Sequence, residues 1–104
     1  YNKASQIIKS GGITIDTNSR IVRKNGEIVE LTLKEYELLL LFVKNKNIAL
    51  YRETIYEQVW HEPFMGDTRT VDLHIQRLRK KLGIKDCIQS VYKVGYRYIE
   101  GEKI

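Results

Sequence analysis

One run of residues combines groups that bind polyanions with the spacing of a helix. Its apolar residues recur at intervals of four, three and four positions, which places them on one helical face. They are Val71, Ile75, Leu78 and Leu82. The opposite face carries mostly charged and polar side chains, namely Arg69, Thr70, Leu73, Gln76, Arg77 and Lys80. A helix over 68–82 with these two faces has the shape and chemistry to lie in the major groove of DNA.

The positive charge of the chain is concentrated in the same region. The net charge is +5, but residues 1–68 carry nine Lys or Arg and nine Asp or Glu, whereas residues 69–97 carry eight against two. A localised basic surface attracts polyanions, because Lys and Arg that contact phosphates release condensed counterions. A solvated helix end would explain Arg79, Lys80 and Lys81 in part, since the helix dipole favours cations there. It does not explain Arg69 in the first turn, so a nucleic acid is the favoured partner.

The composition is that of one ordinary globular domain, assigned to residues 1–104. The chain is 42% apolar and 30% charged. It has no apolar run near the roughly 20 residues of a membrane span and no secretory signal at its start. Its one cysteine, Cys87, excludes an internal disulfide and favours a reducing, cytoplasmic location. Because Tyr1 is not a natural start residue, we expect a fragment of a longer protein.

Short strands are predicted over residues 7–31. Gly11-Gly12 separates the first two, and Asn25-Gly26 separates the next two. Asn-Gly is a strong hairpin signal, because both central residues of a type I′ turn need a positive φ. We therefore expect a small antiparallel sheet of three or four strands.

A capping box predicts the start of the first helix. Thr32 caps the helix and Glu35 reaches back to the cap amide, and the helix should run to about Asn45. Four residues are predicted to form its core stripe: Tyr36, Leu39, Leu40 and Val43. Three more should widen the stripe: Leu38, Leu41 and Phe42.

Two more helices and a hairpin are predicted after it. The second helix spans residues 52–60, and the third begins at a cap formed by Asp67 and ends at Gly83 in a left-handed conformation. Residues 88–99 should form a strand, a turn and a strand, since Val91, Tyr96 and Tyr98 alternate with polar residues. This order predicts an α+β fold: a winged helix-turn-helix with an N-terminal antiparallel sheet, three helices and a C-terminal β-hairpin wing.

Four segments resemble the effector domains of OmpR/PhoB-type response regulators. They are residues 31–39, Val59-Trp60, Arg69 to Leu82, and Gly95-Tyr96-Arg97-Tyr98. The resemblance implies a winged-helix, sequence-specific DNA-binding domain, the transcriptional output domain of a two-component system. Such domains usually follow a receiver domain, so a receiver and a sensor kinase are implied partners outside this chain. We expect two copies to occupy direct-repeat half-sites through linked binding.

The exposed face of the third helix supplies most predicted DNA contacts. Arg77 should read a base directly, because bidentate contact between Arg and guanine is the commonest specific contact. The resemblance implies base or thymine-methyl contacts for Thr70 and Asp72, although an acid in the first turn also stabilises a helix. Asp72 can alternatively orient Arg69 or Gln76. Phosphate contacts are predicted for Arg69, His74, Gln76, Arg79 and Lys80.

Further DNA contacts are predicted outside this face. The resemblance implies that the indole nitrogen of Trp60 binds a phosphate while its ring packs in the core, and that Ser90 contacts a phosphate. Leu73, Tyr96 and Arg97 complete the predicted set. Many relatives place an Arg and then a Gly just after the first wing strand, where this chain has Tyr92 and Lys93. We expect Lys93 to replace that Arg, with a weaker preference for narrow A·T-rich minor grooves.

The loop over residues 61–66 has a different predicted role. The resemblance implies that it can touch RNA polymerase, and two of its residues are apolar. Alternatively, these two simply cover the core. The loop consists of His61, Glu62, Pro63, Phe64, Met65 and Gly66.

Other classes of function find less support in the sequence. A winged helix that binds a protein through its basic face is the main alternative, and a flat salt dependence would distinguish it. The acids are scattered, without a catalytic triad order or a phosphate-binding glycine loop, so we predict neither an enzyme nor a cofactor. His61 and His74 lack neighbours at metal-ligand spacing. RNA binding lacks a sheet motif with stacking aromatics.

Overall fold

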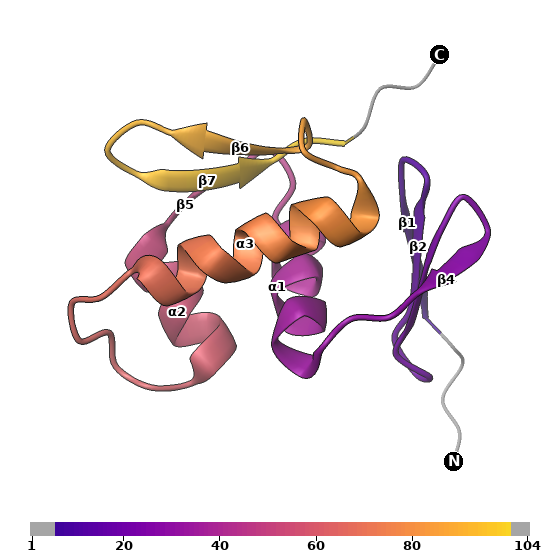
Figure 1. Ribbon diagram of the computed structural model, residues 1–104, viewed down its shortest axis with the longest axis horizontal. Helices are drawn as coiled ribbons and strands as arrows, with labels where there is room; N and C mark the ends of the chain where they lie inside the picture. The colour runs from indigo at the N-terminus through magenta and orange to yellow at the C-terminus, as the bar shows by residue number, and fades with distance from the viewer. Residues whose placement is uncertain (1–5, 101–104) are drawn as a thin grey trace.

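In Figure 1 the N-terminal sheet lies beside the helices, and a hairpin runs across the top. The computed structural model describes residues 6–100. The N-terminal sheet is antiparallel with its strands in chain order: β1 (Ile7–Ser10), β2 (Ile13–Asp16), β3 (Ile21–Lys24) and β4 (Glu27–Val29). Asn25 and Gly26 have φ angles of 53° and 89°, so the predicted Asn-Gly hairpin turn is confirmed.

The first helix, α1 (Leu33–Lys44), begins at the predicted capping box. The backbone N–H of Glu35 donates to Thr32 Oγ1 at 3.2 Å, and the N–H of Thr32 donates to Glu35 Oε1 at 3.0 Å. Lys81 also donates to Glu35 Oε1, at 2.6 Å. Burial acts to raise the pKa of Glu35, but these bonds outweigh it and hold the pKa below its usual value. The carboxylate therefore joins the start of α1 to the third helix.

The buried arc of α1 differs from the predicted one. Leu38 and Phe42 are fully buried, whereas Leu40 and Leu41 are only partly buried. The prediction that Leu40 belongs to the core stripe, with Leu38 and Phe42 at its margin, is wrong for this reason. Since α1 packs against α2 (Arg52–Trp60), α3 (Arg69–Leu82) and the wing at once, neighbours on several sides decide which positions are covered.

The recognition-helix candidate α3 is confirmed as an amphipathic helix, with a change at its start. Its cap residue is Thr68, without a side-chain cap bond, so the prediction that Asp67 caps it is wrong by one position. Asp67 Oδ1 instead accepts the backbone N–H of Arg69 at 2.9 Å. Gly83 ends the helix in the left-handed conformation, as predicted, with φ 64°.

The C-terminal hairpin belongs to a three-stranded sheet. Its strands are β6 (Ile88–Val91) and β7 (Gly95–Tyr98), and the sequence-based prediction missed the third, β5 (Ala49–Tyr51), which pairs antiparallel with β7. A strand of three residues has too little alternation to be recognised. Through β5 the wing is joined directly to the start of α2.

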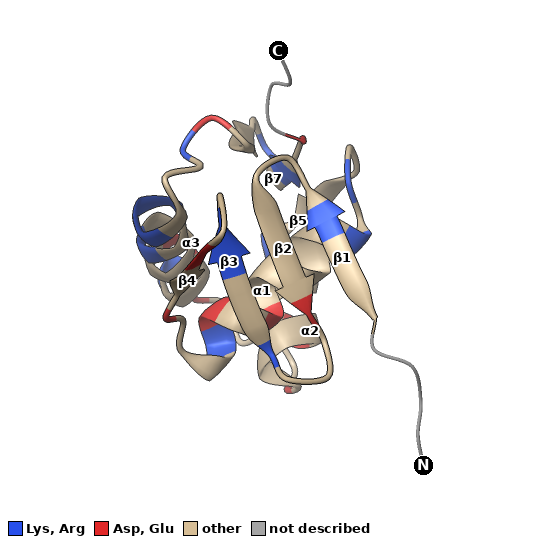
Figure 2. Cartoon of the chain, turned by 90° about the vertical axis from the view of Figure 1, so that its right-hand side faces the viewer, with Lys and Arg blue, Asp and Glu red and all other residues tan. Residues whose placement is uncertain are grey.

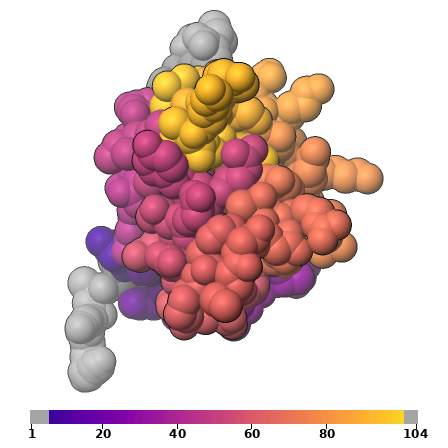
Figure 3. Space-filling view, turned by 90° about the vertical axis from the view of Figure 1, so that its left-hand side faces the viewer, coloured from indigo at the N-terminus to yellow at the C-terminus, as the bar shows by residue number. Residues whose placement is uncertain are grey.

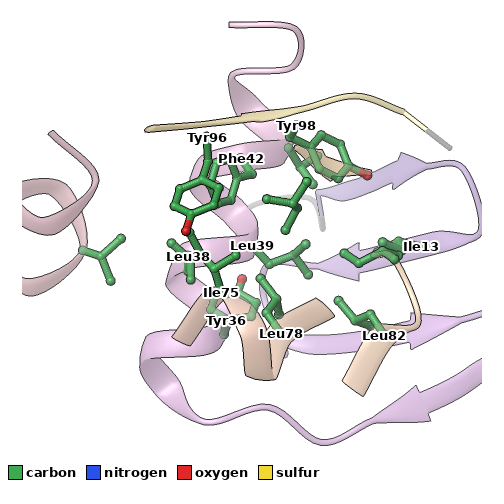
Figure 4. Close-up of a cluster of buried hydrophobic side chains, with 14 of the residues drawn as sticks. Ile13, Tyr36, Leu38, Leu39, Phe42, Ile75, Leu78, Leu82, Tyr96 and Tyr98 are labelled. Atoms are coloured by element: carbon green, nitrogen blue, oxygen red, sulfur yellow. The ribbon is translucent and has the colours of Figure 1, made fainter. Parts of the chain in front are cut away.

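One hydrophobic core lies between the helices and both sheets (Figure 4). Val71, Ile75 and Leu78 have no exposed surface and Leu82 only 2%, so the predicted buried stripe of α3 is confirmed. Where the two sheets meet, the buried hydroxyls of Ser10 and Tyr98 are hydrogen-bonded at 2.8 Å. None of the helices within residues 6–100 has the length and apolar character that crossing a bilayer requires.

Candidate nucleic-acid interface

The outward face of α3 presents cations and polar groups to solvent. Figure 2 shows Lys and Arg positions along this helix. Gln76, Arg77 and Lys80 are exposed, and Leu73 is 49% exposed beside them. Within residues 6–100, the guanidinium of Arg77 makes no hydrogen bond or ion pair. Its five N–H donors are therefore available for a ligand.

Arg69 extends this basic face at the start of α3. Its Nε and Nη2 donate to the two carboxylate oxygens of Asp67, each at 3.2 Å, and the side chain of Arg69 is 90% exposed. The pair raises the pKa of Arg69 and lowers that of Asp67. Such an exposed pair contributes little to stability, so a phosphate can compete for the guanidinium.

His74 is held in a fixed orientation at the edge of this face. Its Nδ1 lies 2.8 Å from the backbone oxygen of Thr70, and its ring meets Trp60 edge-on at 5.0 Å between centroids. Trp60 is half-buried and stacks on Tyr56 at 5.3 Å. A carbonyl only accepts, so Nδ1 carries a proton. His74 Nε2 can then donate to a phosphate only when the imidazole is a cation.

Asp72 links α3 to α2 and to the wing. Its Oδ1 accepts the hydroxyl of Tyr96 at 2.6 Å and Nε of Arg52 at 3.1 Å. The interpretation that Asp72 orients Arg69 or Gln76 is therefore wrong. Burial raises the pKa of Tyr96, and the bond to Asp72 raises it further. We call Arg52, Asp72 and Tyr96 the junction, and Arg52 is the member that the sequence reasoning missed.

Arg79 has a structural contact that the sequence did not indicate. Its Nη2 donates to the backbone oxygen of Ile88 at the start of β6, and its guanidinium lies 5.6 Å from the centre of the Tyr96 ring. The guanidinium of Arg52 lies 5.0 Å from the same ring. Tyr96 itself is only 6% exposed. Arg79 and Tyr96 thus hold the wing against α3, and the predicted DNA contacts of both would have to be made from within this packing.

The remaining predicted wing residues lie on the hairpin. Ser90 is exposed on β6, and Arg97 on β7 donates to Gln89 Oε1 at 3.2 Å. Lys93 is exposed in the turn, where its φ is 63°. These three side chains come from the same sheet that the junction joins to α3.

The loop between α2 and α3 contains both a packed and a projecting apolar residue. Phe64 is partly buried, with its ring edge-on to Tyr56 at 5.8 Å. Met65 is 85% exposed. Phe64 therefore packs against the ring of Tyr56, whereas the side chain of Met65 projects into solvent. The other loop residues are exposed, namely His61, Glu62, Pro63 and Gly66.

The candidate interface is built from hydrogen-bond donors and charged groups. Among residues 6–100, no three His, Cys, Asp or Glu side chains gather in a way that could hold a metal ion. The exposed donors of α3 and the wing instead suit an extended polyanion.

Comparison with known proteins gives a consistent set of similarities. Residues 26–98 match the protein family described as "Transcriptional regulatory protein, C terminal". The chain is 46% identical to the uncharacterized transcriptional regulatory protein YclJ of Bacillus subtilis over 97 residues, covering 90% of this chain and 43% of YclJ. It is 40% identical to the transcriptional regulatory protein SrrA of Staphylococcus aureus over 100 residues, covering 91% and 42%. The chain thus spans less than half the length of these relatives.

Solved structures of other proteins have a similar fold. The DNA-binding domain of Klebsiella pneumoniae RstA, crystallised with the RstA box, has a TM-score of 0.83 and 28% identity, covering 90% of this chain and 97% of that one. The DNA-binding domain of Bacillus subtilis CssR has a TM-score of 0.75 and 36% identity, covering 84% and 99%.

Proposed function

Since the chain belongs to the family of C-terminal domains of transcriptional regulatory proteins, the OmpR/PhoB-type winged-helix effector domains, we propose that it binds duplex DNA in a sequence-specific manner. The family and its named relatives are transcriptional regulators and not enzymes. In this proposal α3 lies in the major groove and the wing contacts the adjacent minor groove. A DNA partner also implies a cytoplasmic site of action.

The strict separation of the two faces of α3 is the observation that carries this proposal. Ile75 and Leu78 are fully buried, while Gln76 and Arg77, their immediate neighbours, are exposed. A helix anchored on one face presents the other in a single orientation, which base reading requires. Arg77 is therefore the residue that we assign to a guanine, and Thr70 and Leu73 suit thymine methyl groups.

Phosphate contacts surround this base-reading segment in the proposal. They come from Arg69 and Lys80 on α3, from His74 when it is protonated, and from Ser90 and Arg97 on the wing. Trp60 can contribute its indole N–H, and Arg79 and Tyr96 can contribute only from their packed positions. Because these contacts carry no sequence information, they set the register of the domain on the duplex.

Because one domain of this size contacts few base pairs, the proposal includes further partners. Two copies on direct-repeat half-sites would bind more tightly through linked binding. A receiver domain and its sensor kinase would control this pairing in the complete regulator. RNA polymerase is the proposed partner of the loop over residues 61–66, through the exposed Met65.

The salt dependence of DNA binding tests the proposal. With about five phosphates engaged, the slope of log affinity against log salt concentration should be about −4.5. Arg77→Ala should weaken binding by about 1 to 3 kcal/mol and relax the preference at one base pair. Arg23→Ala, an exposed arginine of the N-terminal sheet, is the matched control and should bind as the unmodified chain does. A flat salt dependence would instead support a protein partner for the basic face.

The wing allows a second test, of base-pair preference outside the major groove. Lys93 is the exposed cation of the turn, and a narrow A·T-rich minor groove has an enhanced negative potential. Lys93→Ala should therefore reduce affinity by a few-fold, more on duplexes with A·T-rich flanks than on those with G·C-rich flanks. Titrations of both duplexes with both proteins measure this ratio. An unchanged ratio would show that Lys93 does not probe the minor groove.

A further inference from the structure

A lysine of the N-terminal sheet lies on the side of the sheet that faces the core. The strand register places Lys24 of β3 opposite Ile13 of β2, and Ile13 opposite Ser10 of β1. Since directly opposite residues point to the same face of a sheet, Lys24 belongs to the same row as these two buried residues. An ammonium group in a core-facing row needs a partner. That partner lies outside the sheet.

The partner of Lys24 is the carbonyl group of the last residue of α3. Lys24 Nζ donates to the backbone oxygen of Leu82 at 2.7 Å. The last four carbonyls of a helix have no partner in the regular helical pattern, and the helix dipole favours a cation at this end. In the turn that closes α3, the N–H groups of Gly83 and Ile84 both donate to the oxygen of Arg79. The oxygen of Leu82 therefore takes its donor from another element, and Lys24 joins β3 to the end of α3.

The space between the sheet and the end of α3 is only partly filled. A cavity of about 340 Å³ opens there, and its lining includes Lys24, Asn25, Gly83 and Ile84. Close packing fixes the position of an element only where atoms meet atoms. Beside this cavity, the directional hydrogen bond from Lys24 therefore contributes to the position of the helix end.

The contacts that hold the C-terminal half of α3 lie on its inner side. In Figure 3, orange atoms from α3 and the segment after it project beyond the rest of the surface, where they can meet a ligand. On the inner side, Lys24 binds the last carbonyl of the helix, and Lys81 donates to the buried Glu35 of α1. Arg77 lies five positions before Leu82, which is about 7.5 Å along the helix axis. The proposed base-reading residue is therefore close to the Lys24 contact.

We propose that Lys24 is a positioning residue for sequence reading: by binding the end of α3, it fixes the direction in which Arg77 enters the major groove. This inference rests on the proposed function. Hydrogen bonds to base edges tolerate little displacement, whereas long cationic side chains can follow a phosphate that shifts slightly. Loss of the Lys24 contact should therefore reduce discrimination between bases more than it reduces the affinity for DNA in general.

The test compares the affinities for two duplexes that differ at one base pair. The first is selected from a random pool by the unmodified protein, and the second is changed at the base pair where Arg77→Ala relaxes the preference. Lys24→Met removes the ammonium group and keeps most of the aliphatic stem. It should lower the ratio of the two affinities by about threefold or more. An unfolded fraction weakens the apparent binding of both duplexes equally, so a loss of stability by itself leaves this ratio unchanged.

Further variants separate positioning from other roles. Lys24→Arg keeps a donor, for which the cavity has room, and should restore most of the ratio. Lys9→Met removes the same charge from an exposed position of the same sheet and should leave the ratio unchanged. In the Arg77→Ala background, Lys24→Met should no longer affect the ratio, because the residue that it positions is absent.

The salt dependence distinguishes positioning from direct contact with DNA. The Lys24 ammonium binds a backbone oxygen, so Lys24→Met should leave the salt slope unchanged. A slope reduced in magnitude by about 0.9 would overturn the inference, since Lys24 would then be a phosphate contact itself. An unchanged affinity ratio in Lys24→Met would also overturn it and leave the proposed function standing. An unmodified protein that prefers no duplex would contradict the proposed function itself.

Discussion

Gly95→Ala is expected to lower the free energy of unfolding by about 3 kcal/mol, at the upper end of the usual cost of overpacking. Gly95 begins β7 and lies between Tyr51 of β5 and Val91 of β6. A Cβ at this position would overlap the backbone oxygen of Leu50 and lie 2.9 Å from the backbone nitrogen of Arg52. Because these are backbone atoms, relief requires β5 to move away from the wing.

The same displacement should reduce DNA binding beyond its effect on stability. β5 leads directly into α2, whose first residue, Arg52, bonds to Asp72 in the junction. Chemical denaturation measures the stability, and titration with duplex DNA well below the melting temperature measures the binding of the folded fraction. An alanine at position 95 that left both unchanged would contradict the close packing of β5 against β7.

Gly12→Ala is the matched control for this prediction. A Cβ at Gly12 would also be crowded, but by the side-chain amide oxygen of Asn25 rather than by backbone. A surface side chain can rotate away, so the expected cost is below about 1 kcal/mol. The difference in unfolding free energy between Gly95→Ala and Gly12→Ala therefore measures the cost of crowding backbone atoms, separate from the general effect of adding a methyl group.

The parts of this fold that the sequence predicted are those specified by near neighbours. The capping box of Thr32 and Glu35 closes within one turn of helix, and the Asn25-Gly26 turn needs only its own two positive φ angles. The burial of α3 follows from residues three and four positions apart. Each of these features is determined by residues close together in the sequence, so it can be recognised from the sequence alone.

The contacts that join the elements were not predictable in the same way. Asp72 meets Arg52 across 20 positions and Tyr96 across 24, and Lys81 meets Glu35 across 46. No local pattern selects these partners from the other charged residues. The sequence therefore identified the charged face of α3 but not which of its members are held by the protein. Asp72 and Arg79 are held by contacts with other parts of the protein, and Arg77 is not.

Leucine-to-alanine changes at two positions of α3 should have opposite consequences, which makes them the sharpest test of how this helix is divided. Leu78 is fully buried in the core, and Leu78→Ala should cost about 3 kcal/mol through lost apolar burial and the cavity left behind. In a domain of this size such a loss lowers the melting temperature by more than about 10 °C. Calorimetry would measure it directly.

Leu73→Ala removes the same atoms from the outward face of the same helix. Because Leu73 is 49% exposed, the change in unfolding free energy should stay within about 0.5 kcal/mol. Its effect should appear in DNA binding, as a selective loss on duplexes that offer a thymine methyl group to this position. Uracil in place of thymine removes that methyl group, and with it the difference between Leu73→Ala and the unmodified protein should disappear. If Leu73→Ala instead destabilised the fold as much as Leu78→Ala, the outward face would be part of the core, and α3 could not lie in the groove as proposed.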